Sequence, residues 1–265
     1  MDLLECQWCH SQNPSDARSC DHCGAPLDTA TPVSDSGWRE APRLRDMAKF
    51  QFSNSTCQVE GDLCPVAEIN LSPGDGVIFE HRTMLWKDDS VPVGAYPIGG
   101  GLKRSLAGMP FVVTQAGGPG RIAFSRDAAG EIVTLVLHPS MEVDAREHSF
   151  LAASHSVRYS FERIKGLANI LHGGSGMYLD RFVTEGEPGI VLLHGYGNVL
   201  ERTLGAGEKI LVEPGGYLYK DSSVAMQAVQ LNVRTGVLRQ AIYLAEMTGP
   251  GRVGVQSMYH HHATG

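Results

Sequence analysis

Residues 71–93 read LSPGDGVIFEHRTMLWKDDSVPV, and two later stretches align with them over 23 residues without a gap. The second is LHPSMEVDAREHSFLAASHSVRY from Leu137, and the third is LGAGEKILVEPGGYLYKDSSVAM from Leu204. All three begin with leucine. They also share a second leucine, at Leu85, Leu151 and Leu218, and a Ser-Val pair that begins at Ser90, Ser156 and Ser223. Their starts are 66 and 67 residues apart, which is the spacing of an internal repeat.

A second pattern recurs further along each repeat. GGPGRIAF from Gly117, GEPGIVLL from Gly186 and TGPGRVGV from Thr248 each join a Pro-Gly turn to an apolar run. Short apolar runs bounded by Gly and Pro predict strands, and no amphipathic pattern of helical length appears. We therefore predict an all-β domain over residues 47–259, with repeats near 71–124, 137–193 and 204–255 that share a core around a pseudo-threefold axis.

The repeats also resemble a known family. Their L-x-P-G opening, L-x-x-x-x-S-V core, Pro-Gly turns and late GVQSM ending are similar to the altered-inheritance-of-mitochondria protein family over residues 47–259. The resemblance implies a bacterial member, once catalogued as a domain of unknown function. It implies a TRAP-like β domain, related to the tryptophan-attenuator proteins and a short variant of the double-stranded β-helix. It also implies a scaffold more than a catalyst, and no catalytic residues, because the family defines none.

Four of the six cysteines lie near the N-terminus, as Cys6-x2-Cys9 and, after ten residues, Cys20-x2-Cys23. Two such pairs can place four thiolates at the corners of a tetrahedron, which suits zinc. A segment this short cannot bury enough apolar surface to fold alone, so metal binding has to stabilise it. We predict a zinc ribbon at residues 1–27 with one structural Zn²⁺ held by Cys6, Cys9, Cys20 and Cys23. Two disulfides are the alternative, and His10 and His22 are expected beside the ligands rather than among them.

The four cysteines and the ending Cys23-Gly24-x-x-Leu27 resemble the short zinc ribbons at the ends of many bacterial proteins. Residues 28–46 are rich in Ser, Thr, Pro and Asp and predict a flexible linker. The ribbon is then a separate, tethered module. On this interpretation, Cys20→Ser unfolds the ribbon and leaves the melting of the β domain nearly unchanged.

Composition limits the function classes. The net charge of −7 argues against general nucleic-acid binding, because a phosphate backbone recruits basic surfaces. No apolar run reaches the length of a membrane span, and MDLLECQW at the N-terminus lacks the features of a secretory signal. We expect a cytoplasmic protein with unidentified protein partners, any membrane contact being indirect, as a monomer or small homo-oligomer.

The sequence stretches that resemble catalytic or nucleotide-binding motifs each lack a residue that the motif requires. HGGSG from His172 lacks the second glycine of a nucleophile elbow, since Met177 stands there. GGGLKRSLAG from Gly99 lacks the Lys-Ser/Thr ending of a P-loop. The histidines of the repeats, His81, His148, His155 and His194, do not coincide when the repeats are aligned, which disfavours a repeated metal site. The sequence leaves two interpretations for Cys57 and Cys64, a disulfide or two separate thiols. It also leaves two for His260–His262, which lie in a tail at residues 260–265: an adventitious metal chelator or a frayed chain end.

Two classes of function remain. The preferred hypothesis is a non-enzymatic binding or scaffold protein, in which the β domain is a rigid interaction or oligomerisation surface and the ribbon docks a partner. The alternative is a small-molecule sensor or enzyme with a pocket between repeats, lined by Tyr96, Tyr178 and Tyr196.

Overall fold

The computed structural model of the protein describes residues 3–6, 11–14, 17, 20–23, 27, 33–97, 113–164, 177–235 and 238–258. Within these ranges the chain forms β-strands and a 3-10 turn at Pro214–Gly216, without an α-helix. Accordingly, no described helix has the length and apolar character needed to cross a membrane. The predicted all-β class is confirmed.

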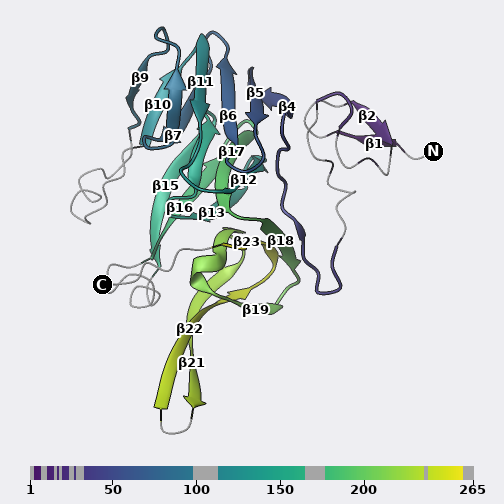
Figure 1. Ribbon diagram of the computed structural model, residues 1–265, viewed down its shortest axis with the longest axis vertical. Helices are drawn as coiled ribbons and strands as arrows, with labels where there is room; N and C mark the ends of the chain where they lie inside the picture. Colours follow the sequence, from purple (N-terminus) through teal and green to yellow (C-terminus); the bar gives the residue numbers. More distant parts are fainter. Residues whose placement is uncertain are drawn as a thin grey trace.

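From Val66 onward the described strands fall into three consecutive sets of six (Figure 1). The first set is β6 (Val66–Leu71), β7 (Gly76–Glu80), β8 (Met84–Lys87), β9 (Val93–Ala95), β10 (Val113–Gly117) and β11 (Gly120–Phe124). The second is β12 (Gly130–Leu137), β13 (Glu142–Arg146), β14 (Phe150–Ser154), β15 (Val157–Ile164), β16 (Met177–Thr184) and β17 (Gly189–Tyr196). The third is β18 (Val199–Leu204), β19 (Lys209–Val212), β20 (Tyr217–Asp221), β21 (Ala225–Thr235), β22 (Leu238–Thr248) and β23 (Gly251–Gln256).

The strands of each set pair in the same way. The first and third strands both pair with the sixth, as in β6–β11 and β8–β11, β12–β17 and β14–β17, and β18–β23 and β20–β23. The second and fourth strands both pair with the fifth, as in β7–β10 and β9–β10, β13–β16 and β15–β16, and β19–β22 and β21–β22. Every one of these pairings is antiparallel.

Consecutive sets are joined by strand pairing. β14 pairs with β7 at what we call the first junction, and β20 pairs with β13 at the second junction. Figure 1 shows the sets following one another down the long axis, the first at the top and the third at the bottom. None of the described pairings joins the third set back to the first, and no described sheet closes into a barrel. The pseudo-threefold axis stays a prediction.

The recurring Ser-Val and Pro-Gly motifs contact each other within each set. Gly120 and Gly251, which follow the prolines, have φ of +138° and +136°, a backbone region that suits glycine. A Cβ placed at Gly120 would lie 2.6 Å from Val91 Cγ2, and one at Gly251 would lie 2.8 Å from Val224 Cγ2. The same position in the second set, Gly189, faces Val157 Cγ2 at 2.5 Å. Each valine therefore packs where the glycine leaves room, a physical reason for the coincidence in sequence.

The N-terminal region is paired with the body, which corrects part of the predicted linker. β3 (Arg39–Glu40) pairs with β18, and Arg43 forms a bridge to Val133 in β12. Two further strands, β4 (Lys49–Phe52) and β5 (Ser55–Glu60), pair with each other, and β5 pairs with β6. Residues 39–60 thus cover the first strand of all three sets. The sequence suggested a flexible segment over residues 28–46, but Arg39 to Arg43 are held by pairing and by the ion pair of Arg43 with Glu131 at 2.6 Å.

Each junction contains a buried ion pair. At the first junction, Arg126 Nη2 donates to Glu80 Oε2 at 2.9 Å and to the carbonyl of Phe150 in β14 at 3.0 Å. Burial by itself raises the pKa of Glu80, but nearby His148 and the hydrogen-bonded Arg126 hold it below its usual value. At the second junction, Lys220 Nζ lies 2.8 Å from Asp144 Oδ2, and both side chains are almost fully buried. These charges therefore serve the packing of one set on the next.

Candidate metal centre

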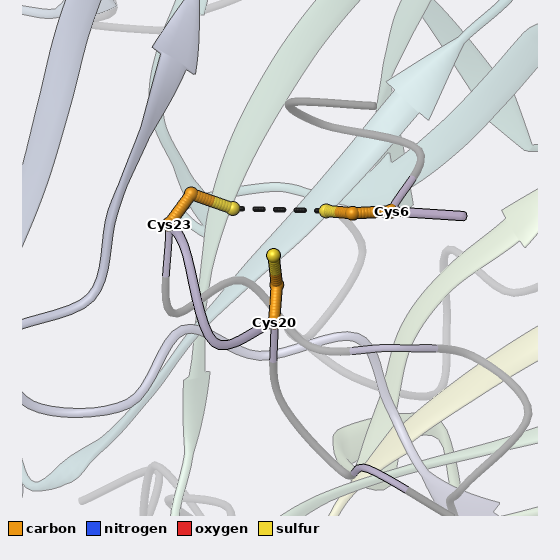
Figure 2. Close-up of side chains that lie close together, drawn as sticks. All are labelled: Cys6, Cys20 and Cys23. Atoms are coloured by element: carbon orange, nitrogen blue, oxygen red, sulfur yellow. Dashed lines mark hydrogen bonds between the residues drawn. The ribbon is translucent and has the colours of Figure 1, made fainter. Parts of the chain in front are cut away.

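Three of the four predicted metal ligands converge at the N-terminus. The Sγ atoms of Cys6, Cys20 and Cys23 all lie within 4.8 Å of one another, and the Cys6–Cys23 sulfur distance is 3.6 Å. Figure 2 shows the three thiols pointing toward a common centre. Cys6 and Cys20 are buried and Cys23 is half-buried. The fourth predicted ligand, Cys9, and neighbouring His10 lie outside the described residues; His22 is described, exposed and not part of the group.

A short hairpin and two polar side chains position the thiols. β1 (Leu3–Glu5) pairs with β2 (Gln12–Pro14), and Cys6 follows β1 directly. Ser11 Oγ lies 2.9 Å from Cys20 Sγ. Asn13, only 1 % exposed, accepts from the backbone N–H of Asp21 through Oδ1 at 2.9 Å, while its Nδ2 donates to the carbonyl of Ser11 at 2.9 Å. Asn13 thereby ties the two cysteine turns together, a role that its place in the sequence does not signal.

The donor set fits a tetrahedral metal. Thiolates bound to one Zn²⁺ at about 2.3 Å lie about 3.8 Å apart, close to the 3.6 Å between Cys6 and Cys23. A disulfide requires about 2.05 Å between its sulfur atoms, far shorter than this distance. The three described ligands are all sulfur, a soft donor set that suits zinc. The geometry therefore favours a metal over a disulfide between Cys6 and Cys23.

The ribbon packs against the β body. Cys6, Cys20 and Leu27 belong to one buried cluster with Ala48 and Phe50 of the body. The backbone N–H of Lys49, at the start of β4, donates to the carbonyl of Cys23 at 3.1 Å. In Figure 1, β1 and β2 lie beside β4. The prediction of a tethered, independent module is therefore wrong in this respect, because the metal-binding turn and the body share a core.

Comparison with known families agrees with both parts of the chain. The sequence pattern of a zinc-ribbon domain matches residues 6–27. The pattern of the family described as mitochondrial biogenesis AIM24 matches residues 57–258, more than half of the chain. The chain belongs to the AIM24 family. The predicted resemblance, to this family with an N-terminal zinc ribbon, is confirmed.

A solved structure resembles the fold of this AIM24-family protein. The X-ray structure of protein SPYM3_0169 from Streptococcus pyogenes superimposes with a TM-score of 0.58 at 19 % sequence identity. The alignment covers 77 % of this chain and 93 % of that one. At this identity the likeness shows the fold alone. A comparison with curated proteins gives no significant match.

Elsewhere in the AIM24-family body, the predicted histidines do not gather. Among the described residues, Cys6, Cys20 and Cys23 form the group of His, Cys, Asp and Glu side chains close enough to hold a metal. His148 is half-exposed, 3.9 Å from Glu80, and His155 lies on the second set. The HGGSG and GGGLKRSLAG stretches and His260–His262 lie outside the described residues.

A pocket of about 400 Å³ lies between the first and second sets. Its wall includes Gly76, Pro92, Gln115 and, from the second set, His155. Asp75 also lines it, but both of its carboxylate oxygens accept hydrogen bonds from the protein, including the backbone N–H of Gly76. The predicted tyrosines lie elsewhere: Tyr96 packs on the core, Tyr196 contacts His194, and the side chain of Tyr178 is outside the described part.

The two remaining cysteines are separate thiols in this structure. Cys57 lies in β5 and is fully buried, whereas Cys64 is exposed in the following turn. Burial, with a smaller contribution from Glu68, raises the pKa of the Cys57 thiol far above its usual value. Cys57 therefore stays protonated and behaves as a small apolar core residue.

His194 should make stability depend on pH. It is 1 % exposed in β17, and its Nε2 lies 3.1 Å from the carbonyl of Ala128. Burial, aided by nearby Arg126, lowers its pKa from 6.5 to about 4. Between these values the unfolded chain binds a proton that the folded chain does not, so stability falls as the pH drops, by up to about 3 kcal/mol.

Urea unfolding of wild type and His194→Gln at pH 7, 6, 5 and 4.5 checks this prediction. The variant should show a flatter dependence of the unfolding free energy on pH over this range. His138→Gln, at an exposed turn, is the matched control and should follow wild type. Equal slopes in wild type and His194→Gln would contradict the assignment.

Proposed function

We propose that this AIM24-family protein is a non-enzymatic binding or scaffold protein of a reducing, cytoplasmic compartment. Its ribbon holds one structural Zn²⁺ through Cys6, Cys9, Cys20 and Cys23, and the ribbon and β body together present a rigid surface to a protein partner. The observation that supports this most directly is the shared core of Cys6, Cys20 and Leu27 with Phe50. A ribbon fixed on the body can present a partner with one continuous binding face.

The buried charges of the body are consistent with this proposal. Asp144, Glu80 and Glu201 are each at most 2 % exposed, and each has a basic partner in the body. A catalytic acid or base needs access to a substrate, which these side chains lack. They are used instead to hold strands together, as expected of a rigid scaffold.

The ribbon also exposes an apolar side chain that a partner could cover. Leu3, in β1, is 63 % exposed, and the hairpin to which it belongs holds the metal-binding turns in place. Leu3→Lys removes this apolar contact while leaving the cysteines untouched. This variant therefore distinguishes the loss of an apolar docking contact from the unfolding of the ribbon.

A pull-down from lysate of the protein's own host tests the proposal. Intact protein, Leu3→Lys and Cys20→Ser are compared, with Leu63→Lys, a 73 % exposed leucine on the body, as the matched control. Partners retained by Leu63→Lys but lost from both ribbon variants support ribbon docking. Partners unchanged in all variants would move the function onto the β body, and an empty list would count against a scaffold.

The pocket that includes His155 supports a second candidate, a small-molecule sensor or enzyme. Its volume of about 400 Å³ lies within the range of ligand pockets, roughly 300–1,000 Å³. A thermal-shift panel of metabolites on wild type and His155→Ala tests this alternative. A compound that stabilises wild type and not the variant would favour it, and turnover of that compound would make the protein an enzyme.

A further inference from the structure

The two junctions between sets use one and the same register. At the first junction Ala152, Ala153 and Ser154 of β14 lie opposite Phe79, Ile78 and Val77 of β7. At the second junction Tyr219, Lys220 and Asp221 of β20 lie opposite Ala145, Asp144 and Val143 of β13. Counted from the leucine that opens each repeat, Leu71, Leu137 or Leu204, these pairs join identical positions. The third strand of one set thus pairs with the second strand of the set before it.

This rule leaves two strand edges unused. In the first set the third strand is β8, which pairs with β11 and ends its sheet. In the third set the second strand is β19, which pairs with β22 and ends its own sheet. Within the described residues, neither strand has a partner on its other side. Figure 1 places the first and third sets at opposite ends of the molecule.

The side chains on these two edges are exposed where their counterparts are buried. Leu85 of β8 is 58 % exposed, whereas Leu151 and Leu218, at the same repeat position, are fully buried. Leu211 of β19 is 48 % exposed, whereas Ile78 and Asp144 at its position are at most 1 % exposed. Trp86, next to Leu85, is 37 % exposed. Exposed apolar side chains on an open strand edge are a template for pairing with another chain.

We propose that β8 of one copy pairs with β19 of a second copy, which continues the register of the two internal junctions. Transferring that register places Trp86 opposite Val212, Lys87 opposite Leu211 and Asp88 opposite Ile210. The contact is head to tail, so each copy uses two different surfaces and keeps one of each available for the next copy. The inference rests on the proposed scaffold function and names a second copy of this chain as a partner.

The charges on the two edges are compatible with this pairing. Glu246 of β22 lies opposite Leu211 in the described sheet. The transferred register therefore places Lys87, Leu211 and Glu246 in one row on the same face, with opposite charges on either side of a leucine. The second junction has a comparable row, Lys220, Asp144 and Arg181, in which the charges pair directly. The row spans two strand spacings of about 4.8 Å each, so Lys87 and Glu246, whose carboxylate also binds Lys209 at 2.9 Å, are within reach of each other's long side chains.

Sedimentation velocity over a range of concentrations tests the inference with full-length, zinc-loaded protein. Wild type should gain mass as concentration rises. Leu85→Lys on β8 and Leu211→Lys on β19 should each weaken self-association at least about tenfold, because each puts a charge where the proposed pairing would cover a leucine. Leu63→Lys, on the exposed turn between β5 and β6, is the matched control and should assemble like wild type.

A mixing experiment distinguishes head-to-tail pairing from other contacts. Each edge variant retains one intact edge, so an equimolar mixture of Leu85→Lys and Leu211→Lys should form a 1:1 dimer at concentrations where each alone is monomeric. Melting temperatures equal to wild type establish that the variants are folded, and Trp86→Lys replaces Leu85→Lys if that variant melts early. A mixture that stays monomeric, or a wild type that is monomeric throughout, overturns the inference.

The same variants keep the inference and the proposed function distinguishable. If the wild type is monomeric but still loses host partners when Leu3 is replaced, self-pairing is wrong and the scaffold proposal stands. If the edges assemble but no host partner is captured, self-pairing stands and ribbon docking is wrong.

Discussion

Replacing Cys20 by serine should release the metal and also lower the melting temperature of the β body. Cys20 is 2 % exposed and its sulfur lies within 4.8 Å of those of Cys6 and Cys23. Without a thiolate at this position the ribbon loses metal-binding free energy on the order of 10 kcal/mol, more than a segment this small recovers by packing. The ribbon should then unfold, and zinc content should fall from one ion per chain to none.

The effect on the body follows from the contact surface. Leu27 and Phe50 are both 2 % exposed and lie in the cluster that contains the cysteines. Exposing one or two side chains of this size costs about 1.5–3 kcal/mol each. In a chain of this size 1 kcal/mol shifts the melting temperature by about 2–4 °C, so we expect a fall of at least about 3 °C.

Metal analysis and thermal melting of wild type, Cys20→Ser and Cys64→Ser test this prediction. Cys64 is exposed in the body, so its variant controls for the loss of a thiol and should keep both metal and melting temperature. A strong chelator should bring wild type to the level of Cys20→Ser and leave Cys20→Ser unchanged. Loss of metal without any change in the body's melting would show that the ribbon folds independently after all.

The parts of the fold that could be predicted from sequence are those with a local or periodic signal. Four cysteines in two CxxC pairs predict a metal site within a segment of about 20 residues. The Ser-Val and Pro-Gly motifs recur because each valine packs on a glycine in every set, as with Val91 and Gly120. Strands with such motifs could be located without knowing what lies beside them.

The parts that could not be predicted depend on partners far away in the chain. Arg39 reads as a solvated linker residue, and its role appears only once Glu201, 162 residues later, lies beside it. Asn13 looks like any polar residue of a turn until its contact with Asp21 is known. The open edges cannot be predicted from the repeat pattern. Leu85, Leu151 and Leu218 are the same residue at the same repeat position, and they differ only in how far other residues cover them.

Asp144→Ala should strongly destabilise the body. Asp144 is 1 % exposed and accepts hydrogen bonds from Arg181 Nε at 2.7 Å and Lys220 Nζ at 2.8 Å. Removing it leaves the Lys220 ammonium buried at the second junction without a carboxylate. Loss of one partner from a buried pair costs about 3–5 kcal/mol, and urea unfolding should show a decrease of this size.

The charge state of the pair supports measurement at neutral pH. Burial by itself raises the pKa of Asp144, but the hydrogen bonds from Arg181 and Lys220 outweigh burial and hold the pKa below its usual value. A lowered carboxyl pKa stabilises the folded state above the unfolded-state pKa, and this stabilisation is lost only as the pH falls through the folded-state value. At pH 7 the whole contribution is therefore present.

The residues at the first junction suggest a double variant that should compensate for the loss of Asp144. There the same register places Ile78 opposite Ala153, an apolar pair at the positions of Asp144 and Lys220. Asp144→Ile combined with Lys220→Ala copies that pair and should recover most of the stability lost in Asp144→Ala, because no buried charge is left alone at the junction. Arg181 keeps its contact with exposed Glu162, and Glu162→Ala alone should cost less than about 1 kcal/mol.

The comparison of single and double variants separates two accounts of the second junction. If the double variant recovers, the loss in Asp144→Ala comes from the stranded ammonium and the junction tolerates an apolar core. If it remains as unstable as the single variant, the pair itself specifies how the third set packs on the second. A loss below about 1 kcal/mol in Asp144→Ala would contradict both accounts, since Lys220 would then have reached water or the carbonyl of Asp221, 3.5 Å away.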